Sequence, residues 1–317
     1  MKLTDLIILM ILPLAATFIF GCTTVNTPTP AQPYVFLLQW GSVGSAEGQF
    51  NAPEEIAVDS SDNLYVVDKN NNRVQKFDSS GAFLLQWGTT GNGNGQFMSP
   101  TGVAVDGSGN VYVVDRINSR VQKFDSSGNF ITKFGSYGTG ESGEMEYPWG
   151  AAVDNTNNYV FVTDSDISRL QKFTTSGAHV ALTGGPGTAE GEFGYPRGLA
   201  VDSQNDLYVA DTQNWRIQKF NSNLVFISQW LISRGGTGSL GMPYEIAIDS
   251  NDQVFVADAV DRIQIYDNTG VFQAQWGSTG TGEGEFSQPA GLAIDSSDNI
   301  YVVDRGNNRI QKFQPNP

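Results

Sequence analysis

The strongest constraint on this chain is a pattern that occurs six times at intervals of 46 to 48 residues. Each copy contains Ala-Val-Asp or Ala-Ile-Asp, with a proline six residues before the aspartate and an apolar residue three before the proline. Repeats of this length predict one supersecondary unit per copy, packed against its neighbours. The aspartates are Asp59, Asp106, Asp154, Asp202, Asp249 and Asp295. The prolines are Pro53, Pro100, Pro148, Pro196, Pro243 and Pro289.

Each copy holds four short runs of β-branched and aromatic residues. In the first copy these runs cover residues 56–58, 64–67, 73–77 and 83–87, with Asp, Asn, Ser and Gly between them. Such residues favour strands and tight hairpin turns, and no helical period separates the runs. The sequence therefore predicts an all-β fold, a six-bladed β-propeller of four-stranded antiparallel blades.

The two ends of the repeated region complement each other. The last copy stops after its third run, 309–313, and has no fourth. A matching fourth run, 34–40 (YVFLLQW), stands before the first copy and resembles 83–87 (FLLQW). We expect the N-terminal strand to join the last blade, because a closed ring leaves no exposed inner edge.

Two segments of the last copy carry a family resemblance. Residues 289–296 (PAGLAIDS) and 299–313 (NIYVVDRGNNRIQKF) resemble the NHL repeat, and all six copies match it over about residues 34 to 313. The resemblance implies a six-bladed propeller but no single activity. NHL propellers serve as protein-binding, RNA-binding and sensor modules, and related propellers are lyases or lactonases.

Residues 1–33 differ in character from the repeats. Lys2 precedes an apolar run at 6–20, which is short for a membrane span of about 20 residues and suits a signal peptide. Residues 19–22 (IFGC) resemble a lipobox, so Cys22 is the expected lipidation site. The expected organisation is a signal peptide at 1–22, a Thr/Pro-rich tether at 23–33 and a propeller at 34–317. Such a protein is exported and lipid-anchored outside the cytoplasm, and it contacts the membrane through its lipid alone.

Composition excludes several classes of function. The formal net charge is −15, which disfavours a nucleic-acid binder because such proteins need a clustered basic surface. The chain has a single cysteine and a single histidine, so disulfides within the chain and Cys/His zinc sites are excluded. RNA binding, which some NHL relatives perform, also conflicts with export.

Every copy also contains an acid and a base at fixed places. An aspartate ends the second run and an arginine begins the third, as in Asp68 and Arg73 or Asp304 and Arg309. A catalytic group is needed once, whereas a residue in every blade serves the blade. These pairs are therefore predicted to be structural, charge-assisted hydrogen bonds.

Candidate binding residues stand where the copies depart from their common pattern. The loops that lead into the first and third runs share one face of a propeller, and rigidly held loops carry most binding residues. The residue directly after each proline varies most between the copies. The second residue after the proline is Gly in four copies and Glu in two. The loops that follow the second runs also differ between the copies. The predicted ligand-binding residues are Glu54, Glu55, Arg116, Trp149, Arg197, Trp215, Tyr244 and Glu245. An alternative is that the aromatic side chains only cover the core.

The leading interpretation is a surface-tethered, non-catalytic binding or scaffold module, monomeric and without a cofactor. Its ligand would be a protein, peptide or glycan, recognised through one face of the propeller. The alternative is a metal-dependent hydrolase or lyase, because the resembling lactonases and lyases hold a metal in the central channel. A single histidine leaves a calcium-type carboxylate site, built from Glu55 or Glu245, as the option for such an enzyme.

Overall fold

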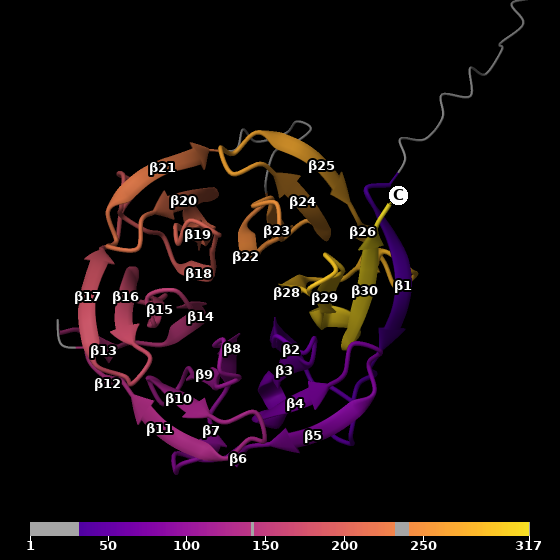
Figure 1. Cartoon of the computed structure of the whole chain (residues 1–317), viewed down its shortest axis with the longest axis horizontal. Helices are drawn as coiled ribbons and strands as arrows, with labels where there is room; N and C mark the ends of the chain where they lie inside the picture. Colours follow the sequence, from indigo (N-terminus) through magenta and orange to yellow (C-terminus); the bar gives the residue numbers. More distant parts are fainter. Residues whose placement is uncertain (1–31, 141–142, 232–240, 317) are drawn as a thin grey trace, which may run out of the picture. The chain divides into compact units, whose positions relative to one another are not determined.

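The structure, a computed structural model, describes residues 32–140, 143–231 and 241–316. These residues form six four-stranded antiparallel sheets arranged as blades around a common axis (Figure 1). The predicted all-β, six-bladed β-propeller is confirmed. The expected signal peptide, Cys22 and most of the tether lie outside the described residues.

Each blade runs from an inner strand beside the axis to an outer strand at the rim. Blade 1 consists of β2 (Pro53–Val58), β3 (Leu64–Asp68), β4 (Arg73–Phe77) and β5 (Phe83–Trp87). Blade 2 consists of β8 (Pro100–Val105), β9 (Val111–Asp115), β10 (Arg120–Phe124) and β11 (Phe130–Phe134). Blade 3 consists of β14 (Pro148–Asp154), β15 (Tyr159–Asp164), β16 (Arg169–Thr174) and β17 (His179–Gly184). Blade 4 consists of β18 (Pro196–Val201), β19 (Leu207–Asp211), β20 (Arg216–Phe220) and β21 (Phe226–Leu231). Blade 5 consists of β22 (Pro243–Ile248), β23 (Val254–Asp258), β24 (Arg262–Tyr266) and β25 (Phe272–Trp276). Blade 6 consists of β28 (Pro289–Ile294), β29 (Ile300–Asp304), β30 (Arg309–Pro315) and β1 (Tyr34–Trp40).

Short elements fill the loops on one face. Two-residue parallel strand pairs precede the inner strands of blades 2, 3 and 6, and 3-10 helices follow the second strands of blades 1, 4 and 6. The pairs are β6 (Thr89–Thr90) with β7 (Gln96–Phe97), β12 (Ser136–Tyr137) with β13 (Glu144–Met145), and β26 (Ser278–Thr279) with β27 (Glu285–Phe286). The 3-10 helices are η1 (Lys69–Asn71), η2 (Thr212–Asn214) and η3 (Arg305–Asn307).

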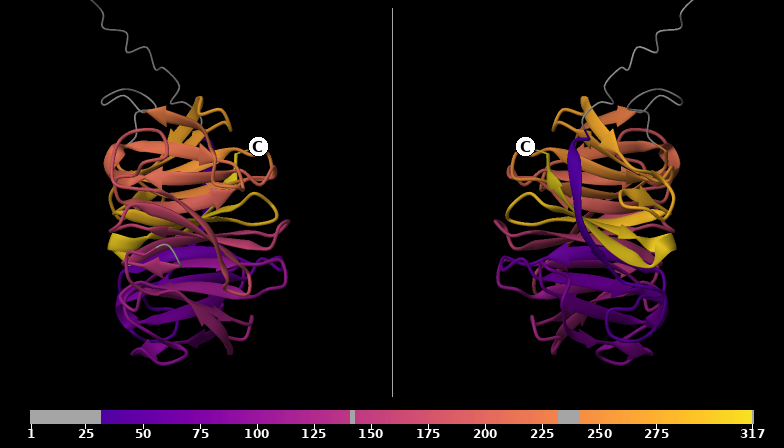
Figure 2. Two further views of the ribbon diagram at one scale, coloured as in Figure 1. Left: turned by 90° about the vertical axis from the view of Figure 1, so that its left-hand side faces the viewer. Right: turned by 90° about the vertical axis from the view of Figure 1, so that its right-hand side faces the viewer.

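The N-terminal strand closes the ring, as predicted. β1 pairs antiparallel with β30, and Phe36 lies opposite Phe313. Figure 2 shows β1, in indigo, running beside the yellow strands of blade 6. The last blade thus receives its outer strand from the other end of the repeated region, which covers the edge of β30.

The core lies between neighbouring blades. Every residue of β3 and β4 is buried, whereas β5 alternates between half-buried and exposed positions. Tyr65 and Val67 of blade 1 pack in one cluster with Phe97 and Val113 of blade 2. Each blade therefore buries both faces of its middle strands, and the position of each inner strand is fixed by two neighbours.

In five of the six repeats the structure pairs the Asp with the Arg, within the framework of the blade. Blade 3 lacks this pair among the described residues, because Nη1 of Arg169 donates to the carbonyl of Gly140 while its Nε and Nη2 are buried without a partner. The Nε of Arg73 donates to Oδ2 of Asp68 at 2.7 Å, and its Nη2 donates to the carbonyls of Ala46 and Gln49. Asp68 is fully buried. The pair thus ties the middle of a blade to the loop that enters it, which is a structural task.

No helix among the described residues has the length and apolar character needed to cross a membrane.

Candidate functional site

A β-bulge at the start of each inner strand interrupts the regular pairing of that strand. The inner strand of blade 1 begins at Pro53, earlier than the predicted residue 56, because Pro53 already pairs with Asp68. The register then shifts before Ile56, which leaves Glu54 and Glu55 outside the regular pairing. Bulges re-aim side chains and recur beside functional sites. A register shift follows the proline in all six inner strands. It leaves two residues outside the regular pairing in five blades, whereas in blade 5 Glu245 pairs with Ala257 and Tyr244 alone lies outside.

Arg197 lies between two aromatic rings at this end of the axis. Its guanidinium carbon is 4.3 Å from the ring centroid of Trp149 and 4.4 Å from that of Tyr244. Its side chain forms no hydrogen bond or ion pair with the described residues, and Nε is buried without a partner. Burial lowers the pKa of Arg197. The guanidinium has thus lost much of its hydration and has gained ring faces instead of acceptors.

Two further cations lie over the Trp149 ring. Lys69 Nζ lies 4.8 Å from the Trp149 ring centroid, and the Arg116 guanidinium lies 5.2 Å from it. We call Lys69, Arg116, Trp149, Arg197 and Tyr244 the axial cluster. Burial lowers the pKa of Lys69, although Glu54 beside it opposes that effect.

Two carboxylates balance part of this charge. Glu54 accepts a hydrogen bond from Lys69 Nζ at 2.9 Å and lies 3.3 Å from Arg305 Nη1. Arg116 donates to the hydroxyl of Tyr195 at 3.0 Å and lies 3.6 Å from Asp166. Arg197 is left without a carboxylate partner among the described residues.

The cations of the cluster stand out in an acidic protein. Most described Lys and Arg side chains belong to the repeated third strands, and Lys133 lies exposed on the outer strand β11. Four described cations remain outside that pattern, and they lie at one end of the axis: Lys69, Arg116, Arg197 and Arg305. A local positive field on a protein of net charge −15 favours an anionic ligand at this place.

Trp149 is the buried aromatic residue of the axial cluster. Its side chain is 8 % exposed, and Arg197, Lys69 and Arg116 lie over its ring. Its carbonyl accepts a hydrogen bond from the buried Thr101 hydroxyl at 2.7 Å. The ring therefore packs like a core residue, and cations lie over its face.

Glu55 and Glu245 lie buried among the inner strands. Burial raises the pKa of Glu55 well above its ordinary value, and the negative charge of Glu245 raises it further. Burial also raises the pKa of Glu245 to about 8. Oε2 of Glu55 has no hydrogen-bond partner. Both shifts favour the protonated forms of these carboxyls, and a protonated carboxyl can donate a hydrogen bond.

The glycines at the matching positions are required by close packing. A Cβ on Gly198 would lie 2.3 Å from Oε1 of Glu245, and a Cβ on Gly150 would lie 2.7 Å from the carbonyl oxygen of Arg197. The inner strands thus approach so closely that glutamates fit in two blades and glycine is needed in the others.

Trp215 has a different place from the other predicted residues. It is the left-handed C-cap of η2 and directly precedes β20, the third strand from the axis. The structure brings Arg116, Trp149, Arg197, Tyr244 and Glu54 together, with Glu55 and Glu245 on neighbouring inner-strand positions. Trp215 instead caps the loop of its own blade.

Two residues of the site were missed in the sequence. Lys69 follows the aspartate that ends the second strand, as Arg116 and Arg305 do, and this shared position could have revealed it. Tyr195 precedes Pro196 and has a positive φ of 58°. It packs edge-on against Trp149, with ring centroids 6.3 Å apart.

The described residues contain no group of three or more His, Cys, Asp or Glu side chains that could hold a metal ion. His179, the single histidine, is on the outer strand β17. The calcium-type site built from Glu55 or Glu245 stays a prediction, and Oε2 of Glu55, buried without a hydrogen-bond partner, is an oxygen of the kind that calcium binds.

Comparison with known proteins agrees with the geometry. The NHL repeat model matches residues 193–220 and 286–313, and a family described as a 6-bladed beta-propeller matches residues 49–133. The fold and its axial face define a six-bladed β-propeller. In particular, two of its repeats, 193–220 and 286–313, are NHL repeats. No curated protein sequence matches it significantly.

Solved structures share the fold at low sequence identity. A streptogramin B lyase is 14% identical with a TM-score of 0.63, covering 91% of this chain and 100% of its own. A virginiamycin B lyase from Staphylococcus aureus is 13% identical with a TM-score of 0.61, covering 89% and 98%. A gluconolactonase from Xanthomonas campestris is 15% identical with a TM-score of 0.64, covering 91% and 99%. At these identities the similarity concerns the fold alone.

Proposed function

We propose that this protein is a non-catalytic binding module, tethered at the cell surface, whose axial cluster recognises an anionic group on a protein, peptide or glycan. The observation that carries this proposal is Arg197, stacked between Trp149 and Tyr244 without a hydrogen-bonding partner among the described residues.

A comparison within the chain supports a ligand role for Arg197. Arg216, a framework arginine, donates to Asp211 and to the carbonyls of Thr188, Ala189 and Glu192. Arg197 is half-buried, and its Nε is buried without such an acceptor, which is costly for a charged donor. A carboxylate or phosphate would supply them, because a guanidinium binds these groups through two parallel hydrogen bonds.

The type of ligand follows from the burial of the rings. A sugar cannot stack on Trp149, because the ring is covered by cations. Tyr244 and Arg197 are half-buried. A ligand can therefore contact the exposed edge of the Arg197 guanidinium and the Tyr244 ring beside it. We therefore place the charged group of the ligand, rather than a sugar face, on Arg197.

Matched pairs of small compounds test this proposal. Glutarate is compared with glutaramide, and glucuronate with glucose, by calorimetric titration of the full chain in a mild detergent. The charged member of each pair should bind, and Arg197→Met should weaken binding by roughly tenfold or more. Lys133→Met removes an exposed cation elsewhere and should leave binding unchanged. Equal binding of the neutral compounds, or no effect of Arg197→Met, would contradict the proposal.

An enzyme remains the second candidate, supported by the lyase and lactonase folds and by the buried pair Glu55 and Glu245. A carboxyl whose pKa is about 8 can accept or donate a proton near neutral pH. The virginiamycin B lyase has also been solved as a catalytically inactive histidine-to-alanine variant. This chain offers one histidine, at the rim. Turnover of a lactone that disappears in Glu245→Gln would favour the enzyme over the binding module.

A further inference from the structure

The opposite face of the propeller carries a lysine in five of its six blades. This lysine is the fourth residue of the third strand, and in blade 1 its Nζ lies 3.6 Å from Oδ2 of Asp59 and 4.7 Å from the ring centroid of Tyr65. It also donates to the carbonyl of Ser126, in the turn of the next blade. The five lysines are Lys76, Lys123, Lys172, Lys219 and Lys312. The repeat thus builds an ammonium site between an aspartate, an aromatic ring and a neighbouring turn.

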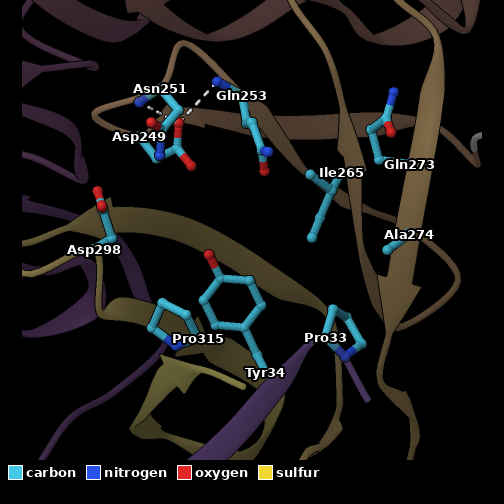
Figure 3. A pocket seen from close by; sticks show the side chains of 10 residues that line it. All are labelled: Pro33, Tyr34, Asp249, Asn251, Gln253, Ile265, Gln273, Ala274, Asp298 and Pro315. Carbon is cyan, nitrogen blue, oxygen red and sulfur yellow. Dashed lines mark hydrogen bonds between the residues drawn. The ribbon is translucent and has the colours of Figure 1, made fainter. Parts of the chain in front are cut away.

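Blade 5 keeps the aspartate but lacks the rest of this arrangement. Ile265 stands in place of the lysine, and Phe255 stands in place of the tyrosine. Asp249 remains, and a pocket of about 390 Å³ opens beside it (Figure 3). The pocket is also lined by Tyr34 and Asp298.

The pocket lies where the ring is closed. In the other blades a turn joins the third strand to the fourth, and the residue two positions before the fourth strand is a glycine in four of them, such as Gly81 against Trp40. In blade 6 that turn is replaced by the chain ends, where Asn316 N–H donates to the carbonyl of Pro33 at 3.0 Å. Tyr34 takes the place of the glycine and stacks on Trp276.

The polar groups facing the pocket have spare hydrogen-bonding capacity. Oδ1 of Asp249 accepts from the backbone N–H groups of Asn251 and Gln253, but Oδ2 has no partner among the described residues. Asp249 and Tyr34 are each 8 % exposed. Figure 3 shows the Tyr34 hydroxyl pointing toward the carboxylates of Asp249 and Asp298, and this hydroxyl is also without a partner there. Burial and the charge of Asp298 raise the pKa of Asp249, as expected for a carboxylate that lacks its cation.

We infer that this pocket binds a primary ammonium group on an alkyl stem, in the place that the repeat lysine fills in five blades. The acceptors are Oδ2 of Asp249 and the Tyr34 hydroxyl, with the negative charge of Asp298 beside them, whose oxygens already accept from the N–H and hydroxyl of Ser250. The alkyl stem would lie between apolar walls, which are formed by Ile265, Ala274, Pro33 and Pro315. A lysine side chain of a partner protein and a free alkylamine share this chemistry. The inference concerns the face opposite the axial cluster and does not depend on the proposed function.

Titration of the full chain with defined amines tests the inference. The probes are n-butylamine, an acetyl-Gly-Lys-Gly amide peptide, the same peptide with norleucine for lysine, and Ca²⁺. Both amines should bind and the norleucine peptide should not. Tighter binding of the lysine peptide than of n-butylamine would assign a protein partner, and the reverse would assign a free amine. Binding of Ca²⁺ alone, or of no probe, would overturn the inference.

Two variants at Ile265 and one at Asp249 locate the site. Asp249→Asn should weaken amine binding by roughly tenfold or more. Ile265→Lys supplies the ammonium from within the chain, so it should raise the melting temperature and abolish amine binding. Ile265→Met has similar length without the charge and should do neither. The inference fails if amines bind Ile265→Lys as tightly as the parent chain, a result that remains readable even if Asp249→Asn does not fold.

Discussion

The ring of Tyr34, the first residue of β1, stacks on Trp276 at the end of β25, with centroids 4.9 Å apart and planes 23° apart. This contact joins the N-terminal strand to blade 5, while the backbone of β1 pairs with blade 6. β1 therefore stabilises two blades at the closure. Offset stacking of this kind adds about 0.5–1.5 kcal/mol beyond the area that it buries.

Deletion of residues 34–40 should unfold or aggregate the protein. The deletion exposes the edge of β30 and uncovers Trp276 and Phe313. Deletion of residues 23–31, which leaves β1 intact, is the control and should change the melting temperature little. Thermal unfolding followed by circular dichroism measures both, and equal melting temperatures would show that β1 is dispensable for closure.

Substitutions in the axial cluster should separate stability from binding. Trp149→Ala removes a buried ring and should lower the free energy of unfolding by about 3–5 kcal/mol. Arg197→Ala and Tyr244→Ala should leave the fold stable and weaken ligand binding by about 1–3 kcal/mol each. Urea unfolding and titration of each variant with glucuronate measure the two effects. Normal binding by both Arg197→Ala and Tyr244→Ala would move the functional surface elsewhere.

Arg216→Met should destabilise the protein far more than Arg197→Met, although both remove a guanidinium that lies inside the ring of blades. The first leaves the buried Asp211 carboxylate without its charged partner, a loss of about 3–5 kcal/mol. The second removes a cation that has no such partner. Urea unfolding of the two variants side by side measures the difference. Equal losses would mean that Arg197 belongs to the framework.

The stability of the protein should decline as the pH rises toward 8. The folded protein keeps a proton on Glu245 up to about pH 8, whereas the unfolded chain releases it near 4.5. The folded state thus binds more protons between these values, and its free energy of unfolding falls as they are removed. Glu245→Gln should flatten this decline in urea unfolding at pH 5 and pH 8.5, and Glu47→Gln, at an exposed site, should not.

Cys22→Ser should move the protein from the membrane fraction to the soluble fraction, because lipidation at Cys22 is the predicted anchor. Mass spectrometry of the N-terminal peptide should find an acyl group on the parent chain and none on the variant. An unchanged distribution without acyl mass would remove the anchor from the proposal. Propeller stability should be unaffected, because Cys22 lies before β1.

The fold could be predicted because every blade repeats the same sequence pattern. The proline, the Ala-Val-Asp turn and the Asp68–Arg73 type of pair recur at fixed spacing, and the unmatched run 34–40 identified the closure. The start of the inner strands was placed too late, because a bulge between Pro53 and Ile56 interrupts the alternation on which strand prediction relies.

The candidate site was predicted less completely, since it depends on distances across the axis. Departures from the repeat singled out Arg197 and Tyr244, but the sequence could not show that a guanidinium lies between rings from two other blades. Trp215 departs from the repeat as clearly and caps its own blade instead. The exchange of lysine for Ile265 is visible in the sequence, yet the pocket beside it depends on where the chain ends meet.

The hydrogen bond from Asn316 to Pro33 has a consequence for engineering. It holds the last and first strands at a separation that a short connection could span, as the hairpin turns do in the other blades. Circular permutants that join these residues and open the chain at another turn between third and fourth strands should keep the same ring. In such permutants the amine pocket would be covered by the new turn at blade 6, and a gap would open beside the blade that precedes the new cut.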